Sequence, residues 1–164
     1  MEEFIRVPYG STVHGEEEID AVINVLKTTT QMSKNVREFE SKVAAKYSKD
    51  YGIMVNSGSS ALYLSIESLN LPMGSEVITP ALTFGTTVAS IVNNKLVPVF
   101  VDVKPDTYCI DETQIESKIT KNTSAIVAPD LMGNICEWPF IRELADKHNL
   151  KILVDSADTI GATY

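Results

Sequence analysis

The sequence has little cysteine and no long apolar run, and each absence excludes a class of protein. Cys109 and Cys136 are its only cysteines, so it carries no disulfide framework and no closely spaced pair of metal-binding thiols. No apolar stretch approaches the roughly 20 residues of a transmembrane helix. The acidic start, MEEFIRVPYG, lacks the layout of a signal peptide. We therefore expect two ordinary thiols in a reducing cytoplasm.

An excess of positive charge is also missing. The chain has 14 Lys and Arg against 22 Asp and Glu, which gives a formal net charge of −8. A surface of that sign repels nucleic acids and anionic membranes, so we expect neither as a partner. What the sequence does have is length and apolar content. Its 164 residues are 44% hydrophobic, which suits one domain with its own core.

Helical and strand patterns alternate along most of the chain. Residues 16–27 place Ile19, Val22, Ile23 and Leu26 on one helical face. Helices are expected over residues 16–27, 35–47, 59–69, 84–93, 113–118 and 137–148. Strands are expected over residues 52–55, 76–79, 97–101, 124–128 and 151–154. This alternation predicts an α/β fold, with a mostly parallel sheet covered by helices on both faces.

Three unusual segments follow predicted strands, at residues 56–60, 80–87 and 155–158. In an open parallel sheet, ligands bind beyond the carboxyl ends of the strands. The three segments are far apart in the sequence, yet the architecture predicts that they meet on one rim of the sheet.

The first segment, NSGSS, puts small hydroxylated residues where a strand turns into a helix. A helix N-terminus offers unpaired N–H groups and a positive dipole end. Gly58 would allow a ligand to approach the backbone, and Ser59 and Ser60 add hydroxyl donors, which together would make a phosphate cradle. The same residues also suit a plain serine N-cap. The nucleotide-loop motifs GxxxxGK[ST] and GxGxxG are absent.

The other two segments supply an aromatic ring and carboxylates. Phe84 follows a strand stopped by Pro80, and its ring suits either stacking on a planar ligand or a place in the core. Asp155 ends a strand of Ile, Leu and Val, and Asp158 lies three residues on. A carboxylate at Asp155 suits a positive ring nitrogen, a metal or a helix cap. Cradle, ring and carboxylate together suit a flat, phosphorylated heteroaromatic cation such as pyridoxal phosphate (PLP).

The ordered motifs VNSGSSAL, EVITPALTF, LVPVFVDVKPDTYCID and LADKHNLKILVDSA resemble the DegT/DnrJ/StrS family of PLP-dependent enzymes, which act on nucleotide-linked sugars. The resemblance covers essentially the whole chain. It implies the large-domain fold of type I PLP-dependent transferases and a homodimer with sites at the interface. Residues 1–164 would form the N-terminal part of the PLP-binding large domain. We expect the rest of that domain and the small C-terminal domain to be absent, which would leave an exposed sheet edge.

The resemblance also implies roles for single residues. Ser59 and Ser60, beside Gly58, would fall at the phosphate of pyridoxal 5'-phosphate or pyridoxamine 5'-phosphate. Phe84 would stack on the ring and Asp155 would pair with the pyridine nitrogen. Asp158 occupies the place where many aminotransferase members carry a Gln near the ring hydroxyl. The catalytic Lys or His is expected beyond Tyr164, so no catalytic residue and no metal ligand is assigned.

Two branches of the family remain open. Aminotransferase members often read EDAAQAHG and HLYG, where this chain has VDSADTIG and, at residues 130–134, DLMGN. The 3-dehydratase branch reads like EDNCDALG and HTLGN, so the local motifs favour it, although Asp130, Ser156 and Ala157 do not match it.

Membership of the family as a whole favours the aminotransferase branch. We expect a sugar aminotransferase of deoxyamino-sugar or cell-surface polysaccharide biosynthesis, acting on a nucleotide-linked keto-sugar with an amino donor such as glutamate. The alternative is a pyridoxamine-phosphate-dependent 3-dehydratase of a nucleotide-linked 4-keto-6-deoxyhexose. A non-catalytic α/β nucleotide-binding or interaction module is the third hypothesis.

Overall fold

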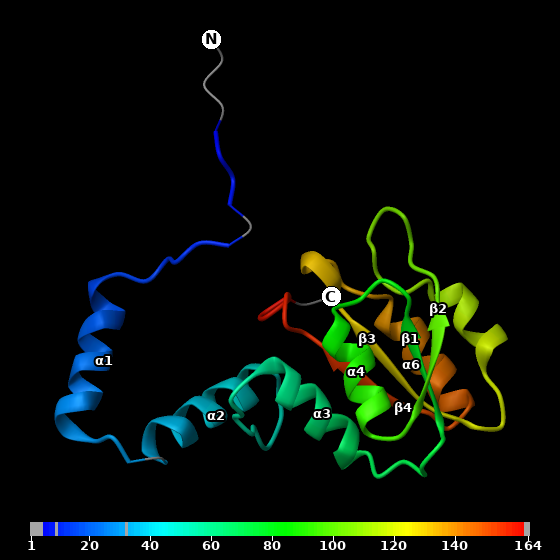
Figure 1. The fold of residues 1–164 in the computed structure, drawn as a ribbon, viewed down its shortest axis with the longest axis horizontal. Helices are drawn as coiled ribbons and strands as arrows, with labels where there is room; N and C mark the ends of the chain where they lie inside the picture. The colour runs from blue at the N-terminus through cyan, green and yellow to red at the C-terminus, as the bar shows by residue number, and fades with distance from the viewer. Residues whose placement is uncertain (1–4, 9, 32, 163–164) are drawn as a thin grey trace.

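The computed structural model describes residues 5–8, 10–31 and 33–162, whose arrangement is drawn in Figure 1. Its centre is a parallel sheet with the strand order β2-β1-β3-β4. The strands are β1 (Glu76–Pro80), β2 (Val97–Val101), β3 (Thr123–Pro129) and β4 (Lys151–Asp155). Each lies within one residue of its predicted bounds. Because all the pairs are parallel, the carboxyl ends of the strands share one edge of the sheet, as the sequence predicts.

The helices also follow the predicted pattern. They are α1 (Glu16–Thr28), α2 (Lys34–Lys46), α3 (Gly58–Ser68), α4 (Gly85–Asn93), α5 (Glu112–Ile115) and α6 (Trp138–Lys147), with 3-10 turns η1 (Glu116–Lys118) and η2 (Leu131–Gly133). The helix predicted over residues 113–118 is α5 continued by η1. The turn η2 was not expected from the sequence.

Helices cover both faces of the sheet, and two apolar clusters hold the layers together. On one face Ile78 and Ile126 pack with residues of α6, Ile141 among them. On the other face the neighbouring strand residues Val77 and Val127 pack with α3 and α4. Successive strand residues therefore enter opposite clusters, as the period of two in a strand requires. The predicted fold class is confirmed.

The strand predicted over residues 52–55 is wrong. This segment has no regular secondary structure and forms no ladder with another strand within the described residues. A side chain holds its backbone instead, because the Met54 N–H donates to Glu40 Oε1 at 2.7 Å. Gly52 lets the segment pass close to α2, since a Cβ there would lie 2.6 Å from the Glu40 carbonyl oxygen. An apolar run becomes a strand only where a neighbouring strand receives its hydrogen bonds.

The apolar face predicted for the first helix is present but uncovered. In α1, Val22 and Leu26 are 60% and 67% exposed, and the helix contains no buried residue. Figure 1 shows α1 lying apart from the sheet. Among the described helices, none combines the length and apolar character needed to cross a membrane.

Candidate functional site

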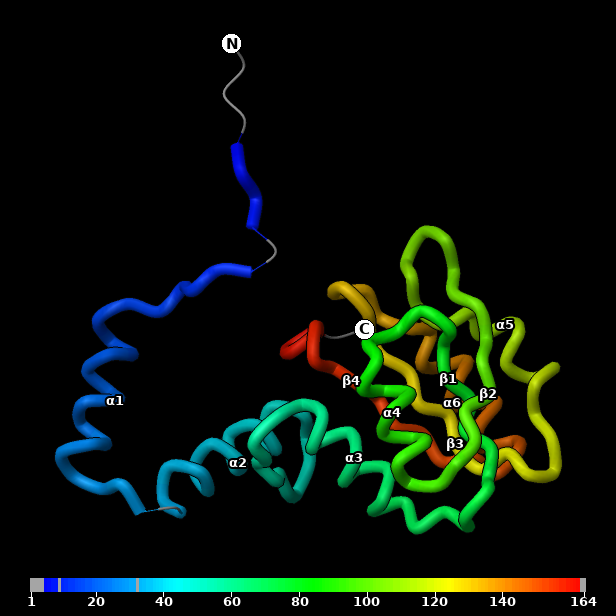
Figure 2. Tube along the Cα trace, in the orientation of Figure 1, coloured from blue at the N-terminus to red at the C-terminus, as the bar shows by residue number. Residues whose placement is uncertain are grey.

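The loops that follow β1, β3 and β4 emerge at the same end of the sheet (Figure 2). The sharing of this end follows from the parallel pairing of the strands. Helix α3 contacts both α4 and β4. The candidate residues of the three segments are therefore carried by elements that pack on one another, although they are far apart in the sequence.

At the start of α3, the N-cap and the predicted phosphate cradle involve different groups, although the sequence alone did not distinguish the two roles. Ser57 is the N-cap: its Oγ accepts from the Ser60 N–H at 3.1 Å, and its hydroxyl donates to Ser60 Oγ at 3.1 Å. The N–H groups of Gly58 and Ser59 belong to the first turn, where a helix offers no acceptor. A Cβ placed on Gly58 would meet no atom within 4 Å. The cap is thus satisfied, and space remains open over the first turn.

Ser59 and Ser60 line a cavity of about 360 Å³ between α3 and α4. Its opposite wall comes from α4, with Thr86, Ser90 and Asn93. This wall was not predicted from the sequence. It could have been found from the spacing of Thr86, Ser90 and Asn93 at i, i+4 and i+7, because that spacing places them on one face of the helix. Hydroxyl and amide groups such as that of Asn93 lie in this cavity among apolar surface, which makes up most of the lining.

Phe84 is an exposed ring at the rim. It precedes α4 in extended conformation and is 69% exposed. The turn around it is fixed locally, since the Thr87 N–H donates to the Phe84 carbonyl oxygen at 2.9 Å and the Thr83 hydroxyl donates to Thr87 Oγ1 at 3.0 Å. Of the two alternatives open from the sequence, a place in the core is excluded, and the ring is free to contact a ligand.

Asp155 is the last residue of β4 and is half-buried. Its Oδ1 accepts from the Ala157 N–H at 3.2 Å, so one carboxylate oxygen caps the turn that follows the strand. Its carbonyl oxygen accepts from the Asp130 N–H at 3.0 Å, which joins the ends of β3 and β4. Among the described residues, the second carboxylate oxygen has no hydrogen-bond partner and can receive one.

Asp158 reaches across to the loop after β3. Its Oδ2 accepts from the Met132 N–H at 3.0 Å. Met132 belongs to η2 and has φ of 56° and ψ of 28°, a left-handed conformation. The sequence analysis placed Asp158 near a ring hydroxyl and had no signal for this contact between residues 26 positions apart.

Asp130, a departure from the family motifs in the sequence, has a structural partner. It is buried, and its Oδ1 accepts from the Trp138 Nε1–H at 2.8 Å and from the Cys136 N–H at 2.9 Å. The carboxylate thereby fixes the connection from β3 to α6. No local pattern in the sequence pairs residue 130 with residue 138, so this role was missed.

The two cysteines lie in the same buried cluster, although no pattern in the sequence predicts that they are neighbours. Both are free thiols. Burial raises the pKa of the Cys136 thiol, and the neighbouring Cys109 raises it further. A protonated, buried thiol is unreactive, which agrees with the expected ordinary role. Within the described residues, no group of three or more potential metal ligands comes together.

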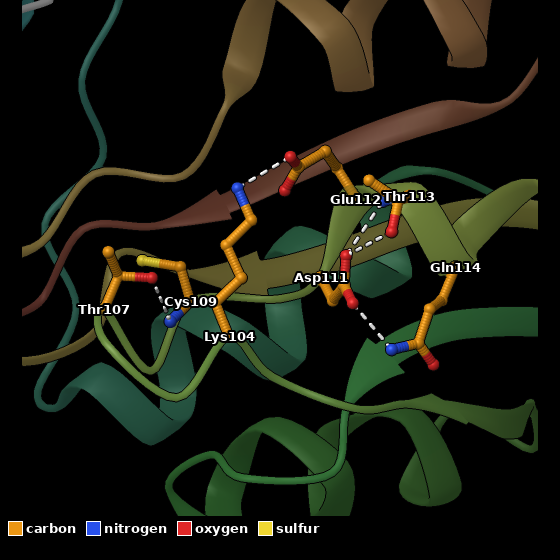
Figure 3. A network of polar contacts seen from close by, with 7 residues as sticks. All are labelled: Lys104, Thr107, Cys109, Asp111, Glu112, Thr113 and Gln114. Carbon is orange, nitrogen blue, oxygen red and sulfur yellow. Dashed lines mark hydrogen bonds and ion pairs between the residues drawn. The ribbon is translucent and has the colours of Figure 1, made fainter.

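The loop after β2 is held by a polar network, drawn in Figure 3. Lys104 Nζ lies 2.6 Å from Glu112 Oε1, and only 10% of the Glu112 side chain is exposed. Asp111 caps α5 by accepting from the Thr113 N–H at 3.1 Å and from the Thr113 hydroxyl at 2.6 Å. Hydrogen bonds from Thr113 and Gln114 lower the pKa of Asp111. These contacts hold the loop after β2 in place. Within the described residues, none of them involves residues 56–60, 80–87 or 155–158.

A larger cavity, of about 590 Å³, lies beside β4 on the side of α6. It is lined by apolar residues such as Ile152, Val154 and Trp138, with Lys49 and Arg142 beside them. It borders Asp130 and Ser156 but none of the residues proposed from the sequence. Of the candidate residues, Ser59 and Ser60 line the cavity between α3 and α4, whereas Phe84 follows β1 and Asp155 and Asp158 lie at and after the end of β4.

Comparison with known proteins identifies relatives that share the fold of this chain. GDP-perosamine synthase of Caulobacter vibrioides is 32% identical to the chain, over 100% of this chain and 45% of that protein. The dTDP-4-dehydro-2,6-dideoxy-D-glucose 3-dehydratase of Saccharopolyspora spinosa is 36% identical, over 96% and 36%. The solved structure of the E. coli GDP-4-keto-6-deoxy-D-mannose-3-dehydratase with bound hydrated PLP matches with a TM-score of 0.91 and 29% identity, over 99% of this chain and 43% of that one.

The chain therefore spans less than half the length of each of these relatives. A family model matches nearly all of it, over residues 12–164. The chain belongs to the DegT/DnrJ/EryC1/StrS aminotransferase family.

Proposed function

We propose that this chain is the cofactor-binding portion of a PLP-dependent enzyme that acts on nucleotide-linked keto-sugars. In this proposal residues 1–164 form the N-terminal part of the large domain. The observation that carries it is the gathering at one end of a parallel sheet of an open helix N-terminus, an exposed ring and a half-buried carboxylate. The names of the relatives support the substrate class, since both describe enzymes of nucleotide-linked deoxysugars.

The phosphate of the cofactor is assigned to the start of α3. Gly58 and Ser59 provide backbone N–H groups at the positive end of a helix of 11 residues. The open space beside Gly58 fits a bulky anion, because no side chain among the described residues fills it. Ser59 and Ser60 add hydroxyls at the edge of the cavity between α3 and α4. These features fit a phosphate group.

The ring of the cofactor is assigned to Phe84 and the carboxylates after β4. The exposed Phe84 ring would stack on the pyridine, and Asp155 would hold a proton on its nitrogen with the oxygen left free by the turn. Asp158 would face the ring hydroxyl with Oδ1, since Oδ2 is bound to Met132. When bound, the cofactor supplies an electron sink for negative charge on the substrate carbon.

Transamination with a donor such as glutamate is the first activity we propose, because the matching family is described as one of aminotransferases. Dehydration at C3 is the second, and one observation favours it. Asn134, which matches the Asn of the dehydratase motif, bridges two rim loops by donating from Nδ2 to the Thr107 carbonyl oxygen at 2.9 Å. A Lys at the catalytic position of the complete protein would favour transamination, and a His would favour dehydration.

A homodimer in the cytoplasm completes the proposal. Apolar side chains on α2 support a further protein surface, since Phe39 and Val43 are 54% and 37% exposed. The two free cysteines agree with a reducing compartment. Sedimentation velocity tests the assembly, and a single monomeric species at high protein concentration would argue against it.

Titration of the protein with pyridoxal 5'-phosphate and pyridoxamine 5'-phosphate tests cofactor binding, with the change in cofactor absorbance as the signal. Replacing Ser59 and Ser60 together by Ala should raise the dissociation constant about 100-fold or more, because each of the two hydrogen bonds to a charged group contributes about 1.5–3 kcal/mol. Ser68→Ala, at the other end of α3, is the matched control. Failure of the unmodified protein to bind either cofactor would refute the proposed function, and an unchanged affinity of the double variant would refute the phosphate assignment.

A further inference from the structure

We propose that Asp158 is a positioning residue, which holds the loop after β3 against the rim by accepting a hydrogen bond from the backbone N–H of Met132. The contact is 3.0 Å long and joins segments 26 residues apart. The proposal rests on the proposed function, because the rim that this loop borders is the assigned cofactor site. Asp158 would then have a structural role in addition to any contact with the cofactor.

The conformation of the loop explains why it needs an anchor. Met132 has φ of 56° and Gly133 has φ of 86°, so two successive residues are left-handed. For Met this conformation is sterically unfavourable, whereas Gly adopts it freely. Met132 is also 70% exposed, so packing of its side chain does little to hold it. The carboxylate of Asp158 supplies the interaction that compensates for the strain at Met132.

Independent contacts fix the two ends of the loop. At its start, buried Asp130 is bound to Trp138 and Cys136. At its end, Asn134 Nδ2 donates to the Thr107 carbonyl oxygen at 2.9 Å. The tip at Met132 lies between these anchors and is bound through Asp158. Loss of the Asp158 carboxylate should therefore release the tip and leave the fold intact.

The anchor is directly connected to the proposed ring-binding carboxylate. Asp158 belongs to the turn that begins at Asp155, whose Oδ1 accepts from the Ala157 N–H. The turn continues with the Thr159 N–H donating to the Ser156 carbonyl oxygen at 3.1 Å. If Met132 moves away, the Asp158 end of this turn loses its hydrogen bond to the loop. Asp155 lies at the other end of the same turn. The position of the loop tip and the orientation of Asp155 are thereby coupled.

Three variants test the proposal: Asp158→Ala, Met132→Gly and the two combined. Asp158→Ala should speed hydrogen exchange of the backbone amide at position 132 about tenfold, because local opening becomes easier. It should also weaken binding of pyridoxamine 5'-phosphate. Met132→Gly removes the steric penalty of the left-handed conformation, so in the Asp158→Ala background it should restore part of the lost affinity. The part that is not restored reflects the contact of Asp158 Oδ1 with the ring hydroxyl.

Two controls and three results decide the outcome. Asp106→Ala removes the same charge from an exposed loop position and should change neither readout. Asp158→Asn keeps an acceptor oxygen, so it should retain most of the protection at position 132. Exchange at that amide unaffected by Asp158→Ala would overturn the proposal. So would unchanged cofactor binding by Asp158→Ala, or weakened binding that Met132→Gly does not restore even in part, since Asp158 would then act only by touching the ligand. If the unmodified protein binds no cofactor, the proposed function fails, while exchange at position 132 still decides whether Asp158 holds the loop.

Discussion

Replacement of Asp130 by Ala should destabilise the protein strongly, because it removes the acceptor of two buried donors. Asp130 is 6% exposed, and its Oδ1 receives hydrogen bonds of 2.8 Å from the Trp138 indole and 2.9 Å from the Cys136 N–H. Each buried donor left without a partner costs about 1–3 kcal/mol. The cavity beside β4 borders both Asp130 and Trp138 and offers space for water, so we expect the lower part of the summed range, about 2–4 kcal/mol.

The sequence contains one Trp, which is itself a partner of Asp130, so its fluorescence reports directly on this contact. Urea unfolding followed by Trp emission and by far-ultraviolet circular dichroism should give coincident transitions and the free energy of unfolding. Asp130→Asn retains an oxygen acceptor of the same size and should lose about half as much stability as Asp130→Ala. Asp20→Ala, on exposed α1, should leave the free energy unchanged.

A loss below about 0.5 kcal/mol in Asp130→Ala, the usual range for surface substitutions, would refute this reasoning. It would mean that water or a shifted backbone satisfies both donors at no cost. An equal loss in Asp130→Asn and Asp130→Ala would also count against it, because the effect would then follow from the charge and not from the acceptor.

Two further predictions concern local stability. The hydrogen bond from Lys104 to Glu112 raises the pKa of Lys104, so this pair contributes fully below the unfolded-state pKa of about 10.4 and its contribution is lost as pH rises through the folded value. Lys104→Met leaves Glu112 buried without its partner, so it should lower the free energy of unfolding by about 1–3 kcal/mol at pH 7. It should also reduce the fall in stability above pH ~10.4. Unchanged stability in urea at pH 7 would contradict this prediction. Ser57→Ala removes the N-cap of α3 and should cost about 1 kcal/mol in the same assay, whereas Ser68→Ala at the other end should cost less, and equal losses would argue against the cap.

Much of the fold was predictable because the controlling patterns are local. Short apolar runs rich in β-branched residues specify strands such as β2 and β3, and alternation of those strands with helices favours parallel pairing. Parallel pairing in turn places every strand's carboxyl end on one edge. For this reason residues 80–87 and 155–158 could be assigned to one end of the sheet from the sequence. Residues 56–60 follow no strand of the described sheet, and they belong to the same region because α3 packs on α4 and β4.

The predictions that failed or stayed open depended on neighbours. Residues 52–55 carry a strand pattern, yet they form no ladder within the described residues. The apolar face of α1 was correctly identified, but a helical period does not say what covers the face. Phe84 suited both the core and the surface, and only the packed structure shows that its ring is exposed.

The sequence by itself determined the elements, the fold class, the family and the three segments that make up the candidate site. Dihedral preferences and apolar periods act over a few residues, so they can be read along the chain. Only the tertiary structure decided that Asp130 binds Trp138, that Cys109 and Cys136 share a cluster, and that Asp158 holds Met132. Those contacts join residues on different strands and loops, and their partners are set by the order of strands in the sheet, which no short stretch of sequence contains.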